Sequence, residues 1–321
     1  MSRYIIRRSL TGILIILVAI FLNFMLIQLA PGDPISILSG QDSPSPEMEE
    51  ALREKYGLND PVGVQFVTYL KTLASGDLGE SILSGRPVIE MIAERIGPTL
   101  LLTLTTAILA LIIGTVLGIY CARRPGSKFD NTLSGISYLF DSMPSFWLGM
   151  MFILLFASWL KIFPTSGMID LRADYSGIAY YLDILYHMIL PATTLTLLST
   201  PYFFRIARSS VIQVMSEDFV TTLRATGMKE SRIFNKYVFK NAVLPTVTVF
   251  GITLAYMITG VAIIEIVFSW PGMGSFMLNA ITRRDYPLLM GIYLVLSISV
   301  AVTMIVIDIL YAFIDPRIRF S

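Results

Sequence analysis

Apolar residues are grouped into six long runs, separated by polar and charged segments. Runs of roughly 20 residues are long enough to cross the hydrocarbon core of a bilayer as helices. The pattern predicts an all-α polytopic membrane protein, with residues 1–321 forming a single transmembrane domain. We expect Pro144, Pro191 and Pro201 to interrupt the third and fourth runs. The six predicted spans cover residues 9–30, 98–122, 134–160, 186–204, 242–264 and 286–311.

Composition supports this class. Hydrophobic residues make up 55% of the 321 residues and charged residues 15%, and the mean hydropathy is +0.70, far above that of a soluble domain. The net charge of +1 gives no bias toward nucleic acid. Cys121 and His187 are single representatives of their types, so neither a disulfide within the chain nor a His/Cys metal cage is expected. We therefore predict no metal site, no cofactor and no catalytic residues.

The positions of basic residues predict the orientation, because cytoplasmic loops carry an excess of lysine and arginine. With six spans, the basic N-terminal, second, fourth and C-terminal connecting segments all fall on one side. The first segment on the other side, residues 31–97, has eleven acidic and five basic residues. Arg283 and Arg284 are the exception on that outer side. Both termini are therefore expected in the cytoplasm, and the first run, too long for the apolar region of a signal peptide, is expected to be retained.

The outer segment 31–97 is too long for a simple loop. Serine and proline precede an acidic turn near Pro46, and Met48, Leu52 and Tyr56 follow at helical spacing. A second helix is predicted over VGVQFVTYLKTLA, and turns over GDLGES and SGRPV. We expect a small, mostly helical extracytoplasmic insert between the first two spans.

The longest predicted cytoplasmic loop, residues 205–241, contains a helix, a glycine turn and a second helix. Glu217 and Asp218 suit the N-terminal end of the first helix, and Gly227 can end it. Arg232, Lys236 and Lys240 recur every four residues beside an apolar stripe, as in a helix at the membrane boundary. From periodicity alone, a positively charged loop with an interfacial helix explains this segment as well as a coupling element does.

Motifs along nearly the whole chain resemble ABC importer permeases of the oligopeptide, dipeptide and nickel branch, in particular the B-type subunit. They include RYIIRRSL, LAPGDP, SMPSFWLG, VFSWPGMGSF and DILYAFIDPRIRF. In the cytoplasmic loop, an R-A-x-G followed by N-A-x-L-P resembles the coupling loop of that family. The family's EAA signature is degenerate here, because Thr221, Thr222 and Leu223 occupy the corresponding positions. The motif residues are Arg224, Ala225, Gly227, Asn241, Ala242, Leu244 and Pro245.

The resemblance implies a type I ABC importer fold and several partners. These are a second, C-type permease, two ATP-binding subunits at the cytoplasmic face, an extracytoplasmic substrate-binding protein and the surrounding lipid of a prokaryotic plasma membrane. The chain has no G-x-x-x-x-G-K-[ST] pattern, so we expect the partners to hydrolyse ATP. Apolar and charged residues of the loop are expected to enter a groove on the ATPase. The expected coupling residues are Phe219, Leu223, Arg224, Ala225, Gly227, Met228 and Lys229.

Polar residues within the spans are candidates for the substrate path, because a buried ionisable group is costly and often functional. Asp141, just before Pro144, either makes a helix-packing hydrogen bond or lines the path. Glu265 precedes a Trp270–Gly274 turn that is either a helix connection or an outer gate. Asp308, near the inner end of the sixth span, either pairs with a basic loop residue, which is the favoured alternative, or takes part in transport.

Other functions and substrates remain open from the sequence. Peptides are the expected substrate, but nickel chelates, other metallophores and glutathione use similar permeases. Asp141 and Asp308 also raise the alternative of an intramembrane aspartyl protease, although the GxGD motif of that class is absent. A channel lacks support because no filter-like repeat is found.

Overall fold

A computed structural model describes residues 2–28, 45–55, 59–257 and 261–314. These residues form helices joined by turns, and one isolated antiparallel bridge joins Glu80 and Pro87. The chain divides into two compact units. Unit 1 comprises Met1–Thr99, Ile258–Ala262 and Gly272–Ser321, and unit 2 comprises Leu100–Met257 and Ile263–Pro271.

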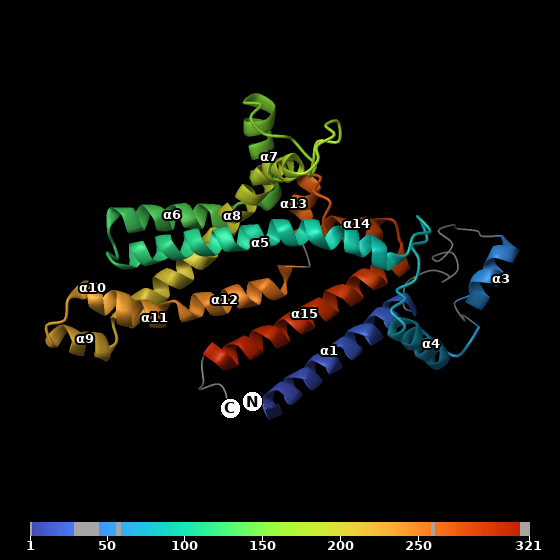
Figure 1. Cartoon of the computed structure of the whole chain (residues 1–321), viewed down its shortest axis with the longest axis horizontal. Coiled ribbons are helices and arrows are strands. Elements are labelled where there is room, and N and C mark those ends of the chain that lie inside the picture. The colour runs from blue at the N-terminus through green and yellow to red at the C-terminus, as the bar shows by residue number, and fades with distance from the viewer. Residues whose placement is uncertain (1, 29–44, 56–58, 258–260, 315–321) are drawn as a thin grey trace. The chain divides into compact units, whose positions relative to one another are not determined.

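Unit 1 brings the two ends of the chain together. Helix α1 (Ser2–Gln28) runs beside α15 (Tyr286–Ile314), as Figure 1 shows. Its core is formed by one face of the first part of α5 (Val88–Ala122), by α14 (Met273–Thr282) and by the start of α15. The buried members of this core are Val88, Ile92, Met273, Phe276, Ala280, Leu288, Ile292 and Leu296.

The described part of the outer segment contains the two predicted helices. Helix α3 (Pro46–Lys55) begins at the predicted proline, and α4 (Val62–Ala74) covers the predicted segment, so both helix predictions are confirmed. Helix α4 packs against α1, because Phe24 lies 5.2 Å from Phe66 and 5.9 Å from Tyr69 between ring centroids. Burial raises the pKa of Tyr69 to about 12.

A buried carboxylate holds the start of α15 in unit 1. Asp285 accepts hydrogen bonds from the Ser81 hydroxyl at 2.6 Å and from the Ile82 N–H at 3.3 Å. It also accepts one from the Leu288 N–H at 3.4 Å, at the first turn of α15. Asp285 is only 2% exposed, so these donors replace the water that its carboxylate loses on folding.

In unit 2, α5 packs closely against α8 (Ile178–Met215). A Cβ atom at Gly114 would lie 2.7 Å from the Phe203 Cβ, and one at Gly118 would lie 2.6 Å from the Phe204 carbonyl oxygen. Two glycines four residues apart lie on one helix face and allow two backbones to approach closely. The packing of α5 on α8 therefore depends on these glycines.

Two further helical stretches of unit 2 precede and follow α8 in the chain. Helix α6 (Lys128–Ser142) and α7 (Ser145–Phe152), which continues as the π-helical η1 (Ile153–Trp159), come before it. After α8 the chain forms a series of short helices and then α12. Their bounds are α9 (Asp218–Ala225), α10 (Glu230–Ile233), the π-helical η2 (Phe234–Val238), α11 (Phe239–Ala242), α12 (Leu244–Ala255) and α13 (Ala262–Val267).

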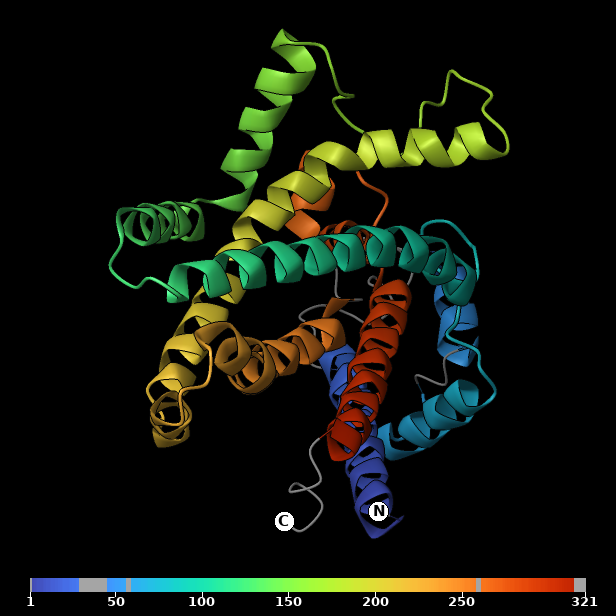
Figure 2. The ribbon, with the colours of Figure 1, turned by 60° about the vertical axis from the view of Figure 1, so that its left-hand side comes forward.

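Four described helices are long and apolar enough to cross a membrane. A fifth span arises if α6 and the stretch Ser145–Trp159, which begins with α7, are counted as one broken span. The axes of these two helical stretches differ by 100°, and Figure 2 shows the bend between them. The apolar part of α1, Leu10–Met25, is shorter than each of these four helices. The predicted count of six therefore stays a prediction. The four helices cover Val88–Ala122, Ile178–Met215, Glu230–Leu254 and Tyr286–Val306.

The prolines act differently from one another. Pro144 lies at the break between α6 and α7, as expected, whereas Pro191 and Pro201 lie inside a continuous α8. The predicted interruption of the fourth span was therefore wrong. Both prolines of α8 are buried in unit 2, and packing holds the helix together where the backbone bonds are missing.

The close approach of α5 and α8 leads to a stability prediction. Alanine in place of Gly118 places a methyl group against the backbone of α8, which cannot move aside as a flexible side chain does. We expect Gly118→Ala to destabilise the assembled complex by about 1–3 kcal/mol. The thermal unfolding midpoint of the purified complex measures this loss.

The matched control is Gly135→Ala on α6, where an added Cβ meets no atom within 4 Å. Both changes bring the same gain in helix propensity, so the difference between them isolates the steric effect. An unchanged or higher midpoint for Gly118→Ala would contradict the close packing.

Candidate functional site

The segment Glu217–Lys229 forms the helix and glycine turn expected from the sequence. Glu217 precedes α9, which ends at Ala225, and Gly227 follows with a φ of 76°. The Gly227 N–H donates to the Arg224 carbonyl at 3.0 Å, and the Met228 N–H donates to the Leu223 carbonyl at 3.3 Å. Space does not restrict Gly227, because an added Cβ would meet no atom within 4 Å, but the positive φ favours glycine.

An apolar core lies beneath this segment. It joins α9, α10, η2 and α11 to the C-terminal ends of α5 and α8. Because α9 and the turn after it carry the predicted coupling residues, we name the four elements α9, α10, η2 and α11 the coupling module. Figure 1 shows α9 and α10 beside the end of α8. The buried members are Ala122, Val211, Val214, Val220, Ile233, Phe234, Val238 and Ala242.

The predicted coupling residues divide between two faces of the coupling module. Phe219, Leu223 and Met228 are half-buried and pack against the apolar core, so each has only part of its side chain available to a partner. The other four predicted residues are exposed. The exposed residues of this face are Thr221, Thr222, Arg224, Ala225, Thr226, Gly227 and Lys229. The three threonines were not among the coupling contacts predicted from the sequence.

Arg224 pairs across the turn with Glu230. Its Nε donates to Glu230 Oε1 at 2.7 Å and its Nη2 to Oε2 at 3.4 Å. This hydrogen bond raises the pKa of Arg224 above its ordinary value. A guanidinium is charged at every physiological pH even without such a bond. Both side chains are exposed, and the pair therefore orients Arg224 more than it stabilises the fold.

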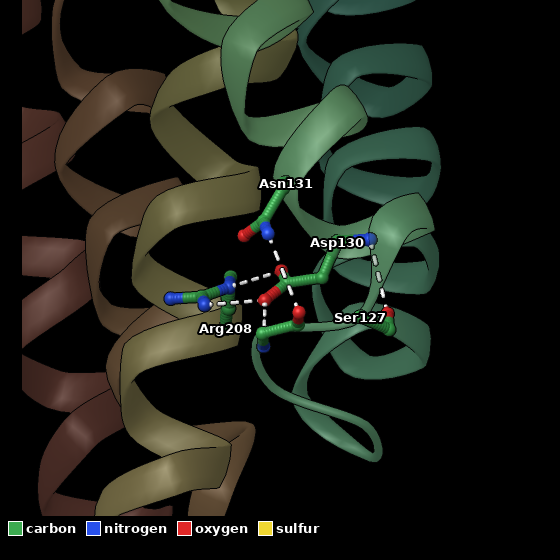
Figure 3. Close-up of polar contacts among 5 residues, drawn as sticks. Ser127, Asp130, Asn131 and Arg208 are labelled. Atoms are coloured by element: carbon green, nitrogen blue, oxygen red, sulfur yellow. Dashed lines mark hydrogen bonds and ion pairs between the residues drawn. The ribbon is translucent and has the colours of Figure 1, made fainter.

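A buried ion pair joins the turn between α5 and α6 to α8, and sequence reasoning missed it. Asp130 is fully buried and accepts from Arg208 Nε at 2.6 Å, Arg208 Nη2 at 2.7 Å and the Gly126 N–H at 2.8 Å (Figure 3). The Ser127 hydroxyl accepts from the Asp130 N–H at 3.2 Å, and the Asn131 amide donates to the Gly126 carbonyl at 3.3 Å. The S-x-x-D spacing of Ser127 and Asp130 is a helix-start signal that could have pointed to this turn.

A second contact connects the same turn to the coupling module. The Arg123 guanidinium carbon lies 4.2 Å from the centroid of the Phe234 ring, a cation–π distance. Phe234 belongs to the buried core of the module. The α5–α6 turn thus contacts both α8 and the helices that follow α9.

The residues predicted for the substrate path lie at different places in unit 2. Asp141 accepts from Arg205 Nη1 at 2.9 Å and from Nη2 at 3.3 Å, with side chains 43% and 35% exposed, and Pro144 precedes α7. Glu265 is fully buried on α13, a helix that contacts Gly149 of α7 through Ile264. The structure thus brings Asp141 and Pro144 to one helix break, and it places Glu265 away from open space.

Other polar groups singled out from the sequence have structural partners or lie outside the description. His187 is buried, with Nδ1 2.9 Å from the Asp183 carbonyl oxygen. The side chain of Asp308 lies outside the described residues. Across the described ranges, no group of three or more His, Cys, Asp or Glu side chains is arranged to hold a metal ion.

Two family models match successive parts of the chain. Residues 1–103 match the N-terminal region of binding-protein-dependent transport system membrane components. Residues 114–320 match the binding-protein-dependent transport system inner membrane component.

Full-length relatives agree with these matches. The oligopeptide transport system permease protein AppB of Bacillus subtilis (strain 168) is 37% identical over 321 residues, which is 100% of both chains. The dipeptide transport system permease protein DppB of Escherichia coli (strain K12) is 34% identical over 337 residues, covering 99% of each chain.

A solved structure shows the same fold. The MetNI methionine ABC transporter, crystallised in inward-facing conformations, superposes with a TM-score of 0.53 at 17% identity. The match covers 71% of this chain and 97% of that one. The expected all-α fold of a type I ABC importer is confirmed. With both family models matched along the sequence, the chain belongs to the family of binding-protein-dependent transport system inner membrane components.

Proposed function

We propose that this chain is the permease subunit of an ATP-driven importer of di- or oligopeptides, and that it forms the translocation path with a second permease. The family supports the transport role, and the names of AppB and DppB support the substrate class. Peptides therefore take precedence over nickel chelates, other metallophores and glutathione. The chain lacks a Walker A pattern, so ATP hydrolysis is assigned to two partner subunits.

The observation that carries the coupling role is the apolar core beneath α9. Val220 of α9 is fully buried in it together with Val211 of α8, so a displacement of α9 acts directly on α8. Close-packed interiors have low compressibility and transmit strain. ATP-driven closure of the ATPases on the exposed face of α9 would therefore move α8, as alternating access requires.

The α5–α6 turn extends this connection to a third helix. Arg208 of α8 binds Asp130 through two hydrogen bonds, and removing one partner of such a buried pair is strongly destabilising. Arg123 and Phe234 add a contact from the module to the same turn. We propose that α6 follows α8 when the coupling module moves.

Orientation and location follow from the charge pattern. We place the chain in a prokaryotic plasma membrane, with both termini and the loop 205–241 in the cytoplasm and residues 31–97 outside, where a substrate-binding protein docks. Asp141, Pro144 and Glu265 remain our proposed path residues. Asp141 has the strongest support, because its carboxylate stays half-exposed beside the helix break even when it is paired with Arg205.

Orientation is tested with single cysteines in a Cys121→Ser background. Ser45 and Ser231 are both exposed. In intact cells, a membrane-impermeant thiol reagent should label Ser45→Cys and leave Ser231→Cys unlabelled, because only the first site faces outward. Permeabilised cells provide the control, since both cysteines should then react. The reverse pattern in intact cells would show that the orientation is inverted.

Coupling is tested at the glycine turn. Gly227→Val places a β-branched residue at a φ of 76°, at a cost of about 1–3 kcal/mol of local strain. We expect the reconstituted complex either to lose its ATPase subunits or to hydrolyse ATP without transport. Transport per ATP hydrolysed, measured in proteoliposomes, reports the effect.

Two variants make this test specific. Gly227→Asn should retain more coupling, because asparagine tolerates positive φ. Gly76→Val creates the same type of strain at a φ of 82° in the outer segment, and transport per ATP should stay at the wild-type value. Wild-type transport and wild-type stimulated ATP hydrolysis in Gly227→Val would exclude this turn from coupling.

A further inference from the structure

A groove of about 280 Å³, lined by both polar and apolar side chains, lies between α6 and α8 in unit 2. Its polar lining residues are Ser134, Ser137 and Tyr138 from α6, and Arg205, Arg208 and Ser209 from α8.

One polar group of the groove is buried without a partner. Ser137 is 8% exposed, and its hydroxyl makes no hydrogen bond within the described part of the chain. A buried hydroxyl without a partner costs free energy, which a polar ligand atom in the groove would recover.

The two arginines of the groove are not equivalent. Arg208 is held by the fully buried Asp130, so its charge is neutralised inside the fold. Among the described residues, Arg205 pairs with the half-exposed Asp141, using one N–H of each of its two terminal nitrogens. A guanidinium has five N–H donors in a geometry that matches a carboxylate. Arg205 is therefore the cation that is free to change partners.

Charge balance defines the kind of ligand that this site would accept. Asp130 with Arg208 and Asp141 with Arg205 make the groove and its margin electrically neutral, so a ligand with a single net charge would leave one charge unpaired there. A ligand that carries both signs can exchange with the exposed pair and keep the sum at zero. Asp141 is the last residue but one of α6, beside the bend between α6 and α7. Broken helices are the kind of place where transporters bind their substrates.

We propose that this groove binds the zwitterionic form of a short peptide, with its terminal carboxylate on Arg205 and Ser137 and its ammonium group on Asp141. The volume of about 280 Å³ lies at the lower limit for small-molecule sites, which suits a dipeptide. The exposed ion pair opens to receive the ligand and closes again on its release. This inference rests on the proposed peptide transport and names the groups of the substrate that are recognised.

The test uses the complete importer in nanodiscs, with Cys121→Ser and the reporter Ser209→Cys at the edge of the groove. Alkylation of the reporter by a small neutral reagent is followed by mass spectrometry in the presence of dialanine, dialanine amide or N-acetyl-dialanine. We expect dialanine to slow the reaction. For the wild-type importer, the concentration needed for half-protection should be about tenfold or more higher with the amide or the acetyl derivative than with dialanine. The Arg205→Gln importer should need a similarly higher concentration of dialanine, because each change removes a charged hydrogen bond.

Matched variants separate binding from folding. Arg232→Gln removes an exposed arginine outside the groove and should leave protection unchanged. Arg205→Lys keeps the charge without the bidentate geometry and should restore part of the protection. Ser137→Ala should weaken protection by dialanine while the amount of assembled complex stays constant.

Three results would overturn the inference. The first is unchanged alkylation in the presence of dialanine, and the second is equal protection by dialanine and its amide. The third is a reporter that reacts in the isolated subunit but not in the assembled importer, because a partner permease would then cover the groove. Dialanine uptake by the same importer, reconstituted in proteoliposomes, keeps the two proposals apart. Uptake without protection removes only the groove, whereas an intact importer that takes up no peptide removes the proposed function.

Discussion

The cost of moving a charge out of water governs how this chain is held together. Asp130 is a fully buried carboxylate in an apolar protein, and it is tolerated because three N–H donors from Arg208 and Gly126 surround it. Asp285 solves the same problem in unit 1 with Ser81, Ile82 and Leu288. In both units a buried acid therefore ties a connecting segment to a helix that is distant in sequence.

Close backbone contact is the second requirement. Lipid gives little hydrophobic driving force between helices, so packing of small residues decides which helices meet. Gly114 and Gly118 bring α5 against α8 where any larger side chain would overlap Phe203 or the Phe204 carbonyl. This contact lies just before the segment in which α8 holds Asp130, and the two interactions together define the position of the α5–α6 turn.

The coupling module uses this rigid base. The inner side of α9 is part of the same apolar core as α8, while the outer side presents small polar residues such as Thr221 and Thr222. An element with one face in a close-packed core and one face exposed is suited to receive force from a partner and pass it inward. The further pair, Asp141 with Arg205, lies where α6 ends and remains half-exposed, so of the two pairs between α6 and α8 only one is available for exchange.

The sequence by itself determined the class of fold, the family resemblance and several local elements. The helix at Pro46, the helix over Val62–Ala74 and the turn at Gly227 follow from local signals, such as proline at a helix start and glycine at positive φ, that need no distant partner. Only the tertiary structure decided that Pro191 and Pro201 leave α8 continuous, that Phe219, Leu223 and Met228 also pack inward, and that Asp130 and Asp141 meet Arg208 and Arg205. These outcomes depend on contacts between residues that are far apart in the sequence, such as Asp130 and Arg208, which are 78 positions apart. The periodicity of one helix does not show which distant side chain will replace the water around a polar group when that group is buried.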